Sequence, residues 1–469
     1  MSKKKIFPSD FVWGAATSSY QIEGAAESNQ RGSCIWDEFC QEPGRIRGGD
    51  TGRVACEHVD RFKEDVQLMK QIGLKAYRFS VCWPRVIPNG VGKINEPGLA
   101  FYDSLVDELL ANDIEPWLTL YHWDFPTALY RRGGWLNPNV SDWFAEYTKV
   151  IVDRLSDRVK KWFTLNEPQV FIGIAHGQAE HAPGTKLPLD DQLRMNHNVL
   201  LAHGKSAKII RDEAKSEPLI GWAPVGVCGI PATESIEDID AARQRTIGTG
   251  ENPIWSNTLY NDPVFFGSYP EQLEPRMDKI LHKDWRHDME TICQPIDYFG
   301  VNIYRGDLVR AGKDGKPDII PPCVGTPRSD FGWEITPDVL RWGAQFLFER
   351  YQKPIIITEN GMSNADWIDL TGRVQDPQRI DYIARHLRGL HDAMEDGIPV
   401  HGYFHWSLLD NFEWAEGYNQ RFGLIHVDFV TQQRTLKSSA HYYGDVIRSQ
   451  GKTIWDTAID IDSSKETGA

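Results

Sequence analysis

Eight short apolar segments are spread along the whole chain, and stretches with a helical pattern separate them. They are residues 11–18, 76–83, 116–123, 161–166, 219–225, 296–304, 354–360 and 400–409. Each is nearly continuous in apolar character and rich in aromatic and β-branched residues. Strands of a parallel sheet that is covered on both faces have this composition, because neither face meets water. The sequence therefore predicts eight buried parallel strands.

The stretches between these strands repeat their apolar residues with the period of an α-helix. In residues 97–113 the apolar stripe consists of Leu99, Tyr102, Leu105, Val106 and Leu109. In residues 141–158 Ser141 is expected to cap a helix whose stripe consists of Phe144, Tyr147, Val150, Ile151 and Leu155. Residues 336–351 and 376–397 each open with a capping residue followed by proline, and the second stretch ends at Gly397.

Strands and helices that alternate in this way predict an α/β fold, namely a single (β/α)₈ barrel. A doubly wound open sheet is the alternative, but such folds usually carry a glycine-rich phosphate turn after an early strand. The sequence has no GxGxxG, and "GTGENP" at 248–253 lacks the third glycine. The extra length around 225–295 and 306–336 is expected to form long loops. Residues 1–469 are predicted to be one domain, with a tail that frays from about Asp460.

The net charge argues against two classes of partner, and the cysteines indicate the compartment in which the protein works. The formal net charge of −15 argues against a nucleic-acid partner and against docking on anionic membranes. No apolar run is long enough for a membrane span, and Pro8 and Asp10 interrupt the run that a signal peptide would need. The seven cysteines include no CxxC pair and fit reduced thiols better than a disulfide framework. We expect a cytoplasmic protein, and the sequence leaves open whether it is a homo-oligomer.

Unusual polar and aromatic residues stand where the predicted strands end. They are Gln21, Arg78, His122, Trp123, Asn166, Glu167, Asn302, Tyr304, Glu359 and Trp406, followed by Glu413 and Trp414. In a (β/α)₈ barrel the active site lies at the carboxyl ends of the strands. A pocket with flat aromatic walls, hydrogen-bonding side chains and two carboxylates is what cleavage of a glycosidic bond requires.

The chemistry of that cleavage explains why two carboxyl groups are needed. One protonates the departing oxygen, and the other attacks or stabilises the anomeric carbon. A separation of about 5–5.5 Å gives retention and one of about 6.5–9.5 Å gives inversion, and the sequence does not measure this gap. Considered alone, each of these residues is more often structural than catalytic. Glu167 and Glu359 would be turn residues, and His122 and Arg78 would be a hydrogen-bonded structural histidine and a core arginine. Their common position at strand ends favours the catalytic interpretation.

Other chemistries find less support in the sequence. It has no HExxH motif, and His401 and His405 lie on a predicted strand without a third ligand, so no metal site is expected. It has no GxSxG motif. Cys82 lies near a strand end without a histidine partner, which indicates a buried, unreactive thiol.

Long motifs in a fixed order, from "FVWGAATSSYQIEGA" to "RFGLIHVD", resemble the family-1 glycoside hydrolases, the β-glucosidase and β-galactosidase group. Between them lie "YRFSVCWPRV", "LTLYHWDFP", "TLNEP", "HAPG", "DYFGVNIY", "ITENG" and "WSLLDNFEWAEGY". The resemblance implies a (β/α)₈ barrel and retaining hydrolysis without a cofactor. It implies that Glu167 is the acid/base, with a raised pKa, and that Glu359 is the nucleophile. It adds three further catalytic residues: Arg78, Asn302 and Tyr304.

The resemblance also implies a subsite for the non-reducing sugar. That subsite would comprise Gln21, His122, Trp123, Asn166, Trp406, Glu413, Trp414 and Phe422, and Asn166 would bind the 2-hydroxyl. Relatives that act on 6-phosphorylated sugars lack the carboxylate of Glu413, so neutral sugars are implied. Relatives that cleave thioglucosides carry glutamine in place of Glu167, so O-glycosides are implied. Trp333 would mark the aglycone side.

Several positions depart from the family pattern, namely Arg305, Tyr260, His176, Ala179, Glu180, Glu57 and Val59. They concern the aglycone preference and leave both carboxylates in place. The sequence therefore predicts an exo-acting, retaining β-glucosidase with some galactosidase or fucosidase activity on small β-glycosides. One alternative is a transglycosylase that passes the same covalent intermediate to an alcohol. Another is a non-catalytic sugar-binding relative, although such proteins usually lose one carboxylate.

Overall fold

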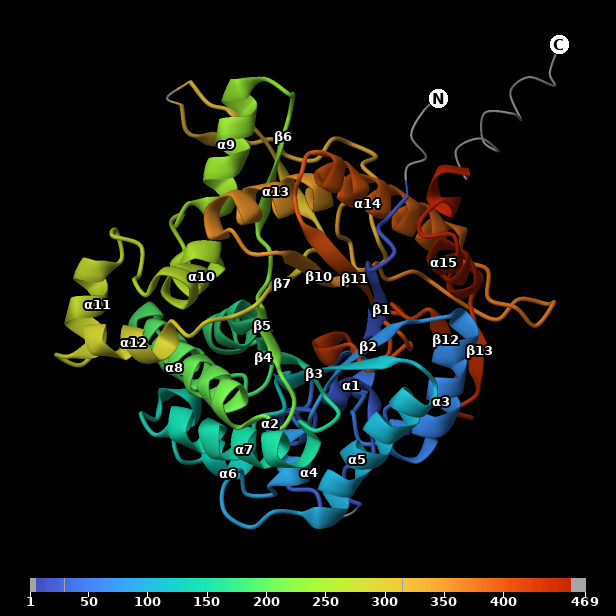
Figure 1. Cartoon of the computed structure of the whole chain (residues 1–469), viewed down its shortest axis with the longest axis horizontal. Coiled ribbons are helices and arrows are strands. Elements are labelled where there is room, and N and C mark those ends of the chain that lie inside the picture. Colours follow the sequence, from blue (N-terminus) through green and yellow to red (C-terminus); the bar gives the residue numbers. More distant parts are fainter. Residues whose placement is uncertain (1–5, 29, 314, 457–469) are drawn as a thin grey trace.

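A barrel of eight parallel strands forms the centre of the computed structural model, which describes residues 6–28, 30–313 and 315–456 (Figure 1). The strands are β1 (Val12–Ala16), β2 (Ala76–Ser80), β3 (Glu115–Tyr121), β4 (Lys161–Asn166), β5 (Leu219–Ala223), β7 (Phe299–Asn302), β10 (Ile355–Asn360) and β11 (Val400–Trp406). Their order is β5-β4-β3-β2-β1-β11-β10-β7, and a bridge between Val225 and Asn302 joins the two ends. Each predicted strand segment overlaps one of these strands, and only β3 begins outside its segment, by one residue, so the predicted fold class is confirmed.

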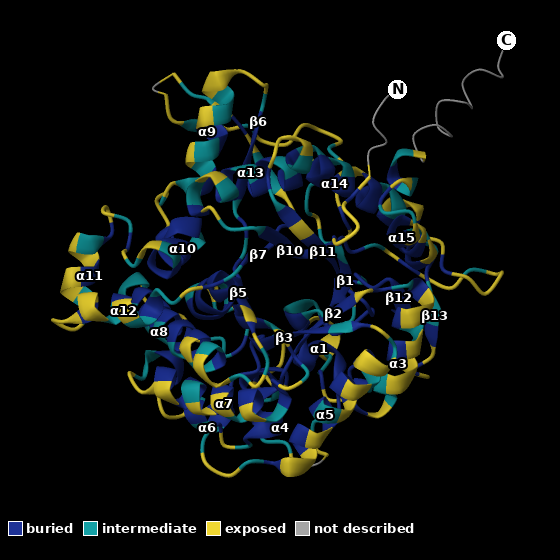
Figure 2. Ribbon diagram, in the orientation of Figure 1, coloured by how far each residue is buried: buried dark blue, intermediate teal, exposed yellow. Residues whose placement is uncertain are grey.

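Helices surround the barrel on the outside (Figure 1). They include α3 (His58–Ile72), α5 (Glu96–Ala111), α7 (Val140–Leu155), α8 (Leu189–Glu213), α13 (Val339–Tyr351), α14 (Pro377–Glu395) and α15 (Ser438–Arg448). Figure 2 shows that these helices bury one side and expose the other. The stripe predicted for α5 is buried throughout, whereas Val150 in the stripe of α7 is only half-buried. In the part of the chain that the structure describes, no helix combines the length and apolarity of a membrane span.

Large side chains fill the middle of the barrel. The ring of Trp117 lies 5.1 Å from that of Phe404 and 5.9 Å from that of Phe163, and all three are buried. Gly300 is needed beside them, because a Cβ atom there would lie 2.6 Å from the ring of Phe163. The barrel is therefore a packed core, and its polar strand ends face the mouth above that core.

Residues 225–295 and 306–336 are not the long loops that were predicted. They contain β6 (Cys228–Pro231), α9 (Ile236–Ile247), α10 (Asn257–Phe266), α11 (Glu274–Ile280), α12 (Asp288–Ile292), β8 (Gly306–Ala311) and β9 (Pro317–Ile319). Strands β6, β8 and β9 form a small separate sheet. Helix α9 buries Ala241 and Ala242, and a Cβ atom on Gly229 of β6 would lie 2.6 Å from a backbone oxygen of Ala242. Small residues on both elements thus allow this helix to pack closely on the small sheet.

Shorter elements lie in the connections of the barrel. They are α1 (Ser19–Ile22), α2 (Ile35–Phe39), α4 (Trp83–Val86), α6 (Thr127–Tyr130), a π-helix (Val170–Gln178), β12 (Ile425–Val427) and β13 (Arg434–Leu436), with single 3₁₀ turns at Arg47–Gly49, Gly134–Leu136, Pro253–Trp255, Trp285–His287 and Trp414–Glu416. Several of these connections carry residues of the mouth, which are described below.

Ser141 is not the N-cap that the sequence predicted. Helix α7 begins at Val140, and Asn139 occupies the capping position. The hydroxyl of Ser141 is buried inside the first turn, where it accepts a hydrogen bond of 2.9 Å from Lys205. The hydroxyl oxygen of Ser141 therefore binds Lys205 of α8 and does not cap α7.

Of the two predicted Pro-led helix starts, one is correct. Helix α14 begins with proline after Asp376, and Gly397, with φ of +87°, follows its end as expected. Helix α13 begins at Val339, two residues later than the Thr336 cap predicts, and Asp338 is its N-cap. The hydroxyl of Thr336 instead accepts a hydrogen bond of 3.0 Å from the backbone of Gly306. Again a contact to another segment has replaced a local cap.

Candidate active site

A cavity of about 560 Å³ opens at the carboxyl ends of the barrel strands. Among the residues that line it are His122, Trp123, Glu167, Asn302, Tyr304, Trp333, Glu359, Trp406, Glu413, Trp414 and Phe422. The other three predicted site residues, Gln21, Arg78 and Asn166, are buried and form hydrogen bonds to residues of this wall. The structure thus brings all the predicted site residues together. The size of the cavity is typical of a small-molecule site.

Glu359 is held at both of its carboxylate oxygens. The guanidinium of Arg78 donates to Oε1 at 2.5 Å, and the hydroxyl of Tyr304 donates to Oε2 at 2.7 Å. The residue lies near the end of β10 and is only 3% exposed. A cation and a phenol thus stabilise the ionised form of a deeply buried carboxyl group.

Arg78, in β2, is in turn fixed by several groups. It donates to Oδ1 of Asn166 at 2.6 Å and to the hydroxyl of Thr119 at 3.2 Å. Its guanidinium carbon lies 5.1 Å from the centre of the Phe163 ring. A buried arginine with this many partners is held in one orientation, so the oxygens of Glu359 are positioned as well.

Glu167 follows directly after β4 and has an unusual backbone conformation. Its φ is +46°, in the left-handed region that non-glycine residues seldom adopt. Backbone hydrogen bonds hold it there: its N–H donates to Ala223 at 2.8 Å, and its carbonyl accepts from Val170 at 2.9 Å and from Phe171 at 3.5 Å. Its side chain receives one hydrogen bond, of 2.9 Å, from Nδ2 of Asn302. Glu167 therefore lacks the direct contact with a cation that Glu359 has.

Burial raises the pKa of both carboxyl groups, but their neighbours differ. For Glu167 the charge of Glu359 raises the pKa further, and Asn302 only partly offsets this. For Glu359 the charge of Arg78 and the hydroxyl of Tyr304 oppose the effect of burial. A single proton shared by the two groups therefore favours Glu167. Two carboxyl groups whose surroundings separate their pKa values are suited to an acid and a nucleophile.

Asn302, the last residue of β7, links the two halves of this arrangement. Its Nδ2 donates to Glu167 and also to Oδ1 of Asn166, at 3.0 Å. Its Oδ1 accepts a hydrogen bond of 2.6 Å from the hydroxyl of Thr358. The sequence analysis did not single out Thr358, although the residue lies in the "ITENG" motif beside Glu359. A small hydroxyl inside a buried strand gives no signal of such a role.

Gln21 and Glu413 form the polar end of the cavity. Nε2 of Gln21 donates to Oε2 of Glu413 at 3.2 Å and to Oδ1 of Asn411 at 3.0 Å. The hydroxyl of Ser18 donates to Oε1 of Gln21 at 2.6 Å. Burial, with a further contribution from the charge of Glu359, raises the pKa of Glu413 to about 8. Ser18 and Asn411, which fix the amide of Gln21, were not predicted as site residues.

Flat rings form the walls of the cavity. His122 stacks on Trp406 with 5.7 Å between ring centres, and Trp123 lies 4.6 Å from Trp414. Nε2 of His122 accepts from Nδ2 of Asn166 at 3.1 Å. Its Nδ1 is buried and has no hydrogen-bond partner among the described residues, and burial lowers its pKa. A neutral imidazole with one free nitrogen can therefore serve a ligand.

Apolar and charged residues together line the rest of the cavity. Trp333 lies 5.3 Å from the Tyr304 ring, and Val170, Ile174 and Trp255, which the sequence analysis did not identify, also line this part. Arg305 reaches the rim, where its side chain is 48% exposed and pairs with Glu334 at 3.4 Å.

Tyr260, another departure from the family pattern, does not line the cavity. It is buried, and its hydroxyl donates to the carbonyl of Ile254 at 3.0 Å, so it supports the turn that carries Trp255. Cys82 is buried below the mouth, and burial raises the pKa of its thiol. This is the environment of an unreactive thiol.

Comparisons with known proteins agree with this geometry. The sequence profile described as Glycosyl hydrolase family 1 matches residues 3–452. The chain is 41% identical to "Beta-glucosidase A" of Thermotoga maritima over 448 residues, which cover 95% of this chain and 99% of the relative. It is 42% identical to "1,4-beta-D-glucan glucohydrolase" of Thermotoga neapolitana over 450 residues, which cover 96% and 100%.

A solved structure, "Beta-glucosidase from Thermotoga maritima in complex with glucoimidazole", superposes with a TM-score of 0.87 at 42% identity, over 95% of this chain and 100% of the other. The match of the profile over nearly the whole sequence and the full-length relatives lead to one conclusion: this chain belongs to glycosyl hydrolase family 1.

Proposed function

We propose that the chain is a retaining exo-β-glucosidase that removes terminal β-D-glucosyl residues from O-glycosides and short oligosaccharides such as cellobiose. The observation that carries this proposal is the unequal environment of the two carboxyl groups. Glu359 is paired with Arg78 and Tyr304, whereas Glu167 is buried beside a negative charge with one amide donor. The names of the relatives, a β-glucosidase and a 1,4-β-D-glucan glucohydrolase, support glucose as the sugar.

In the first step Glu359 attacks the anomeric carbon, and the bond from that carbon to the aglycone oxygen breaks. Glu167 gives its proton to the departing oxygen, so the aglycone leaves as a neutral alcohol. The sugar is then covalently bound to a carboxylate oxygen of Glu359. Since Glu359 has become a neutral ester, the pKa of Glu167 falls, and Glu167 can act as a base in the next step.

In the second step Glu167 accepts a proton from water, and the oxygen of that water attacks the anomeric carbon. The bond to Glu359 breaks, its carboxylate returns to Arg78 and Tyr304, and the β-sugar is released. Two displacements on the same carbon retain its configuration. An alcohol in place of water would give a transglycosylation product.

The polar end of the cavity supports the binding of a neutral sugar. Gln21, His122 and Glu413 offer both donors and acceptors to hydroxyl groups. The amide nitrogen of Asn166 carries two N–H groups, and His122 occupies one of them, so the second can reach the sugar 2-hydroxyl. Trp406 and Trp414 offer flat faces to the sugar ring, and Trp333 offers one to the aglycone.

A weaker activity on β-galactosides is also proposed. Galactose differs from glucose only in the configuration of one hydroxyl group, and the donors and acceptors of Gln21, His122 and Glu413 can still bind it. A solved relative from Thermotoga maritima is described in complex with galacto-hydroximolactam. We further propose a cytoplasmic location, since all seven cysteines are free thiols and four of them are fully or almost fully enclosed.

Covalent labelling tests the proposal. The protein is incubated with 2,4-dinitrophenyl 2-deoxy-2-fluoro-β-D-glucoside, whose fluorine slows the second step so that the glycosyl-enzyme accumulates. Mass spectrometry of the intact protein should show one added fluoroglucosyl group, and peptide mapping should place it on Glu359. Glu359→Gln is the matched control and should take up none.

A label on Glu167 or Glu413 in an active protein would refute the assignment of the nucleophile. Absence of both label and turnover would favour a non-catalytic sugar-binding protein. Labelling of Glu359 combined with products transferred mainly to added alcohol would favour a transglycosylase.

A further inference from the structure

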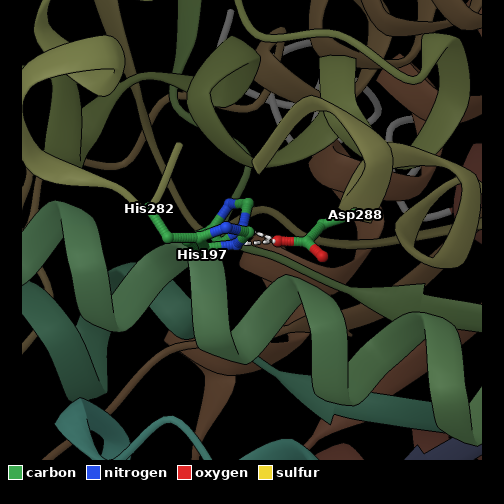
Figure 3. A group of neighbouring side chains, drawn as sticks. All are labelled: His197, His282 and Asp288. Atoms are coloured by element: carbon green, nitrogen blue, oxygen red, sulfur yellow. Dashed lines mark hydrogen bonds and ion pairs between the residues drawn. The ribbon is translucent and has the colours of Figure 1, made fainter. Parts of the chain in front are cut away.

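Three metal-ligating side chains meet on the outside of the barrel, away from the cavity described above. They are His197 in α8, His282 after α11, and Asp288, the first residue of α12 (Figure 3). None of them lines the active-site cavity. Figure 1 shows α11 and α12 at the periphery, on the left of the view, beside α8. The glycosidase reaction leaves this cluster without a role.

The three side chains point their ligand atoms at one place. Nε2 of His197 lies 2.9 Å from Oδ2 of Asp288, and Nε2 of His282 lies 2.6 Å from the same oxygen. All three ligand atoms lie within 4.8 Å of one another. Two ligand atoms on a tetrahedral zinc ion are about 3.3 Å apart, since each bond is about 2.0–2.1 Å long. Small side-chain rotations would therefore allow these three atoms to surround an ion.

The surroundings of His197 are those of a positioned ligand. The imidazole is 2% exposed, and its Nδ1 lies 3.1 Å from the hydroxyl of Tyr269. The ring of Trp285 lies 6.3 Å from it, edge to face. With an ion bound, Nδ1–H would donate to Tyr269 and the lone pair of Nε2 would face the ion. A hydrogen bond on the second nitrogen is the usual way in which a ligating histidine is oriented.

We propose that His197, His282 and Asp288 bind a zinc-type divalent transition-metal ion, with water completing the coordination. Two imidazoles and one carboxylate are a donor set that zinc accepts, whereas magnesium and calcium prefer oxygen ligands alone. The side chain of His282 is 57% exposed, so an ion can enter from solvent and a water can occupy the fourth position. Without an ion, the two imidazoles instead donate hydrogen bonds to Asp288.

The ion would join α8 to the stretch that runs from the end of α11 to the start of α12, because His282 and Asp288 are only six residues apart. Helix α8 packs directly on the barrel, while α11 and α12 belong to the long excursion between β5 and β7. A bond from the ion to each of α8, the segment after α11 and α12 would hold that excursion against the barrel. The ion would therefore stabilise the folded chain, because the unfolded chain does not hold the three ligands together. It would leave the glycosidase chemistry untouched.

Zinc binding to the purified full-length protein tests this inference. After removal of metal with a chelator and dialysis against zinc chloride, bound zinc is counted by plasma mass spectrometry. His282→Ala and Asp288→Asn should each lose one equivalent of zinc relative to the parent protein. The melting temperature of the parent should rise with added zinc but not with added magnesium, and neither variant should respond. His287→Ala, which removes a neighbouring exposed histidine outside the cluster, is the matched control and should behave like the parent.

Cobalt gives a second readout that does not depend on stability. A cobalt ion held by two imidazoles, a carboxylate and water should give an intense visible absorption, and His282→Ala should abolish it. Equal zinc content in the parent and both variants would overturn the proposal, as would a parent protein that binds no zinc. Because the cluster is remote from the cavity, turnover of aryl glucosides should not change in any variant, and this separates the test from that of the proposed glucosidase.

Discussion

The hydroxyl of Thr358 donates a hydrogen bond of 2.6 Å to Oδ1 of Asn302, and this contact turns the amide nitrogen of Asn302 towards Glu167. An amide can lie in either of two orientations, and only one of them offers a donor to the carboxyl group. Thr358 thus acts on the proposed acid through another residue, without touching it. The orientation has a measurable consequence for the pKa of Glu167, because the donated hydrogen bond lowers it.

Thr358→Val should raise the pKa of Glu167. The variant removes the hydroxyl that holds Asn302, so the donor to the ionised carboxylate is weakened or replaced by an acceptor. A neutral hydrogen bond is worth about 0.5–1.5 kcal/mol, which corresponds to about 0.4–1 pH unit. Since the first step requires protonated Glu167, the alkaline limb of kcat/KM should move to higher pH by about that amount.

The pH profile of kcat/KM for an aryl glucoside measures this shift. Thr358→Ser keeps the hydroxyl and should restore the alkaline limb of the parent, although it removes a methyl group from the core. If Thr358→Val lowered activity equally at every pH, the residue would contribute only to packing.

Glu167→Ala should separate substrates by their need for an acid. For cellobiose, whose leaving group is a poor one, kcat/KM should fall by about 10²–10⁴. For a dinitrophenyl glucoside the first step should be largely preserved, and the slow second step should be accelerated by azide, which needs no base. The product to detect is β-glucosyl azide.

Glu180→Ala is the control for this experiment, because Glu180 also lines the cavity but has no place in the proposed chemistry. It should respond neither to the leaving group nor to azide. An equal loss of activity on both substrates in Glu167→Ala would show that another group is the acid.

The barrel was predictable from the sequence because its strands are buried on both faces. Segments such as 161–166 and 354–360 are rich in apolar residues up to their polar ends, and they correspond closely to β4 and β10. Their polar ends then had to meet at one mouth. The small sheet of β6, β8 and β9 could not be predicted in the same way, because β8, for example, is mostly half-buried or exposed and lacks an apolar run.

The large residues of the site were identified, and the small ones that hold them were not. Carboxylates and tryptophans are uncommon at strand ends, so residues such as Glu359 could be predicted as site residues from the sequence. Ser18, Asn411 and Thr358 are ordinary polar residues whose importance lies in the partner that the fold gives them. The cluster of His197, His282 and Asp288 could not be predicted either, because His197 lies far along the chain from the other two residues.

The raised pKa of Glu413 predicts that the free enzyme loses stability as the pH rises. Its folded-state pKa of about 8 lies above the ordinary value of 4.5, so folding favours the protonated form. The stabilisation is complete below about pH 4.5 and is lost as the pH rises towards 8. In that window the slope is at most about 1.4 kcal/mol per pH unit. Glu413→Gln cannot ionise and should escape this loss.

Melting temperatures of the ligand-free proteins between pH 4.5 and 8 check this sign. The difference between Glu413→Gln and the parent should grow in favour of the variant with rising pH. Glu271→Gln, at an exposed position, should show no such trend. A pH-independent difference would mean that Glu413 is already ionised in the folded protein. The more stable variant should still lose kcat/KM, because Gln21 and a sugar hydroxyl would both lose their carboxylate partner.

Arg305 should favour aglycones that carry a negative charge. Its side chain lies at the rim of the cavity, and its partner Glu334 is closer to Arg328, at 2.8 Å, than to Arg305, at 3.4 Å. The charge of Arg305 is therefore only weakly compensated. Since exposed ion pairs contribute about 0.2–1 kcal/mol, Arg305→Ala should lower kcat/KM for a carboxyphenyl glucoside by at most about fivefold and leave the neutral phenyl glucoside nearly unchanged.

Measuring kcat/KM for the two glucosides at high salt tests whether the preference for the charged aglycone is electrostatic. In 1 M sodium chloride the screening length falls to about 3 Å, so the parent should lose its preference for the charged aglycone and resemble Arg305→Ala. Arg310→Ala removes an exposed arginine that does not line the cavity and should keep the preference. A preference for the charged aglycone that survived both high salt and the loss of Arg305 would refute this assignment, because the apolar ring of Trp333 meets the same aromatic ring in both substrates and cannot distinguish their charges.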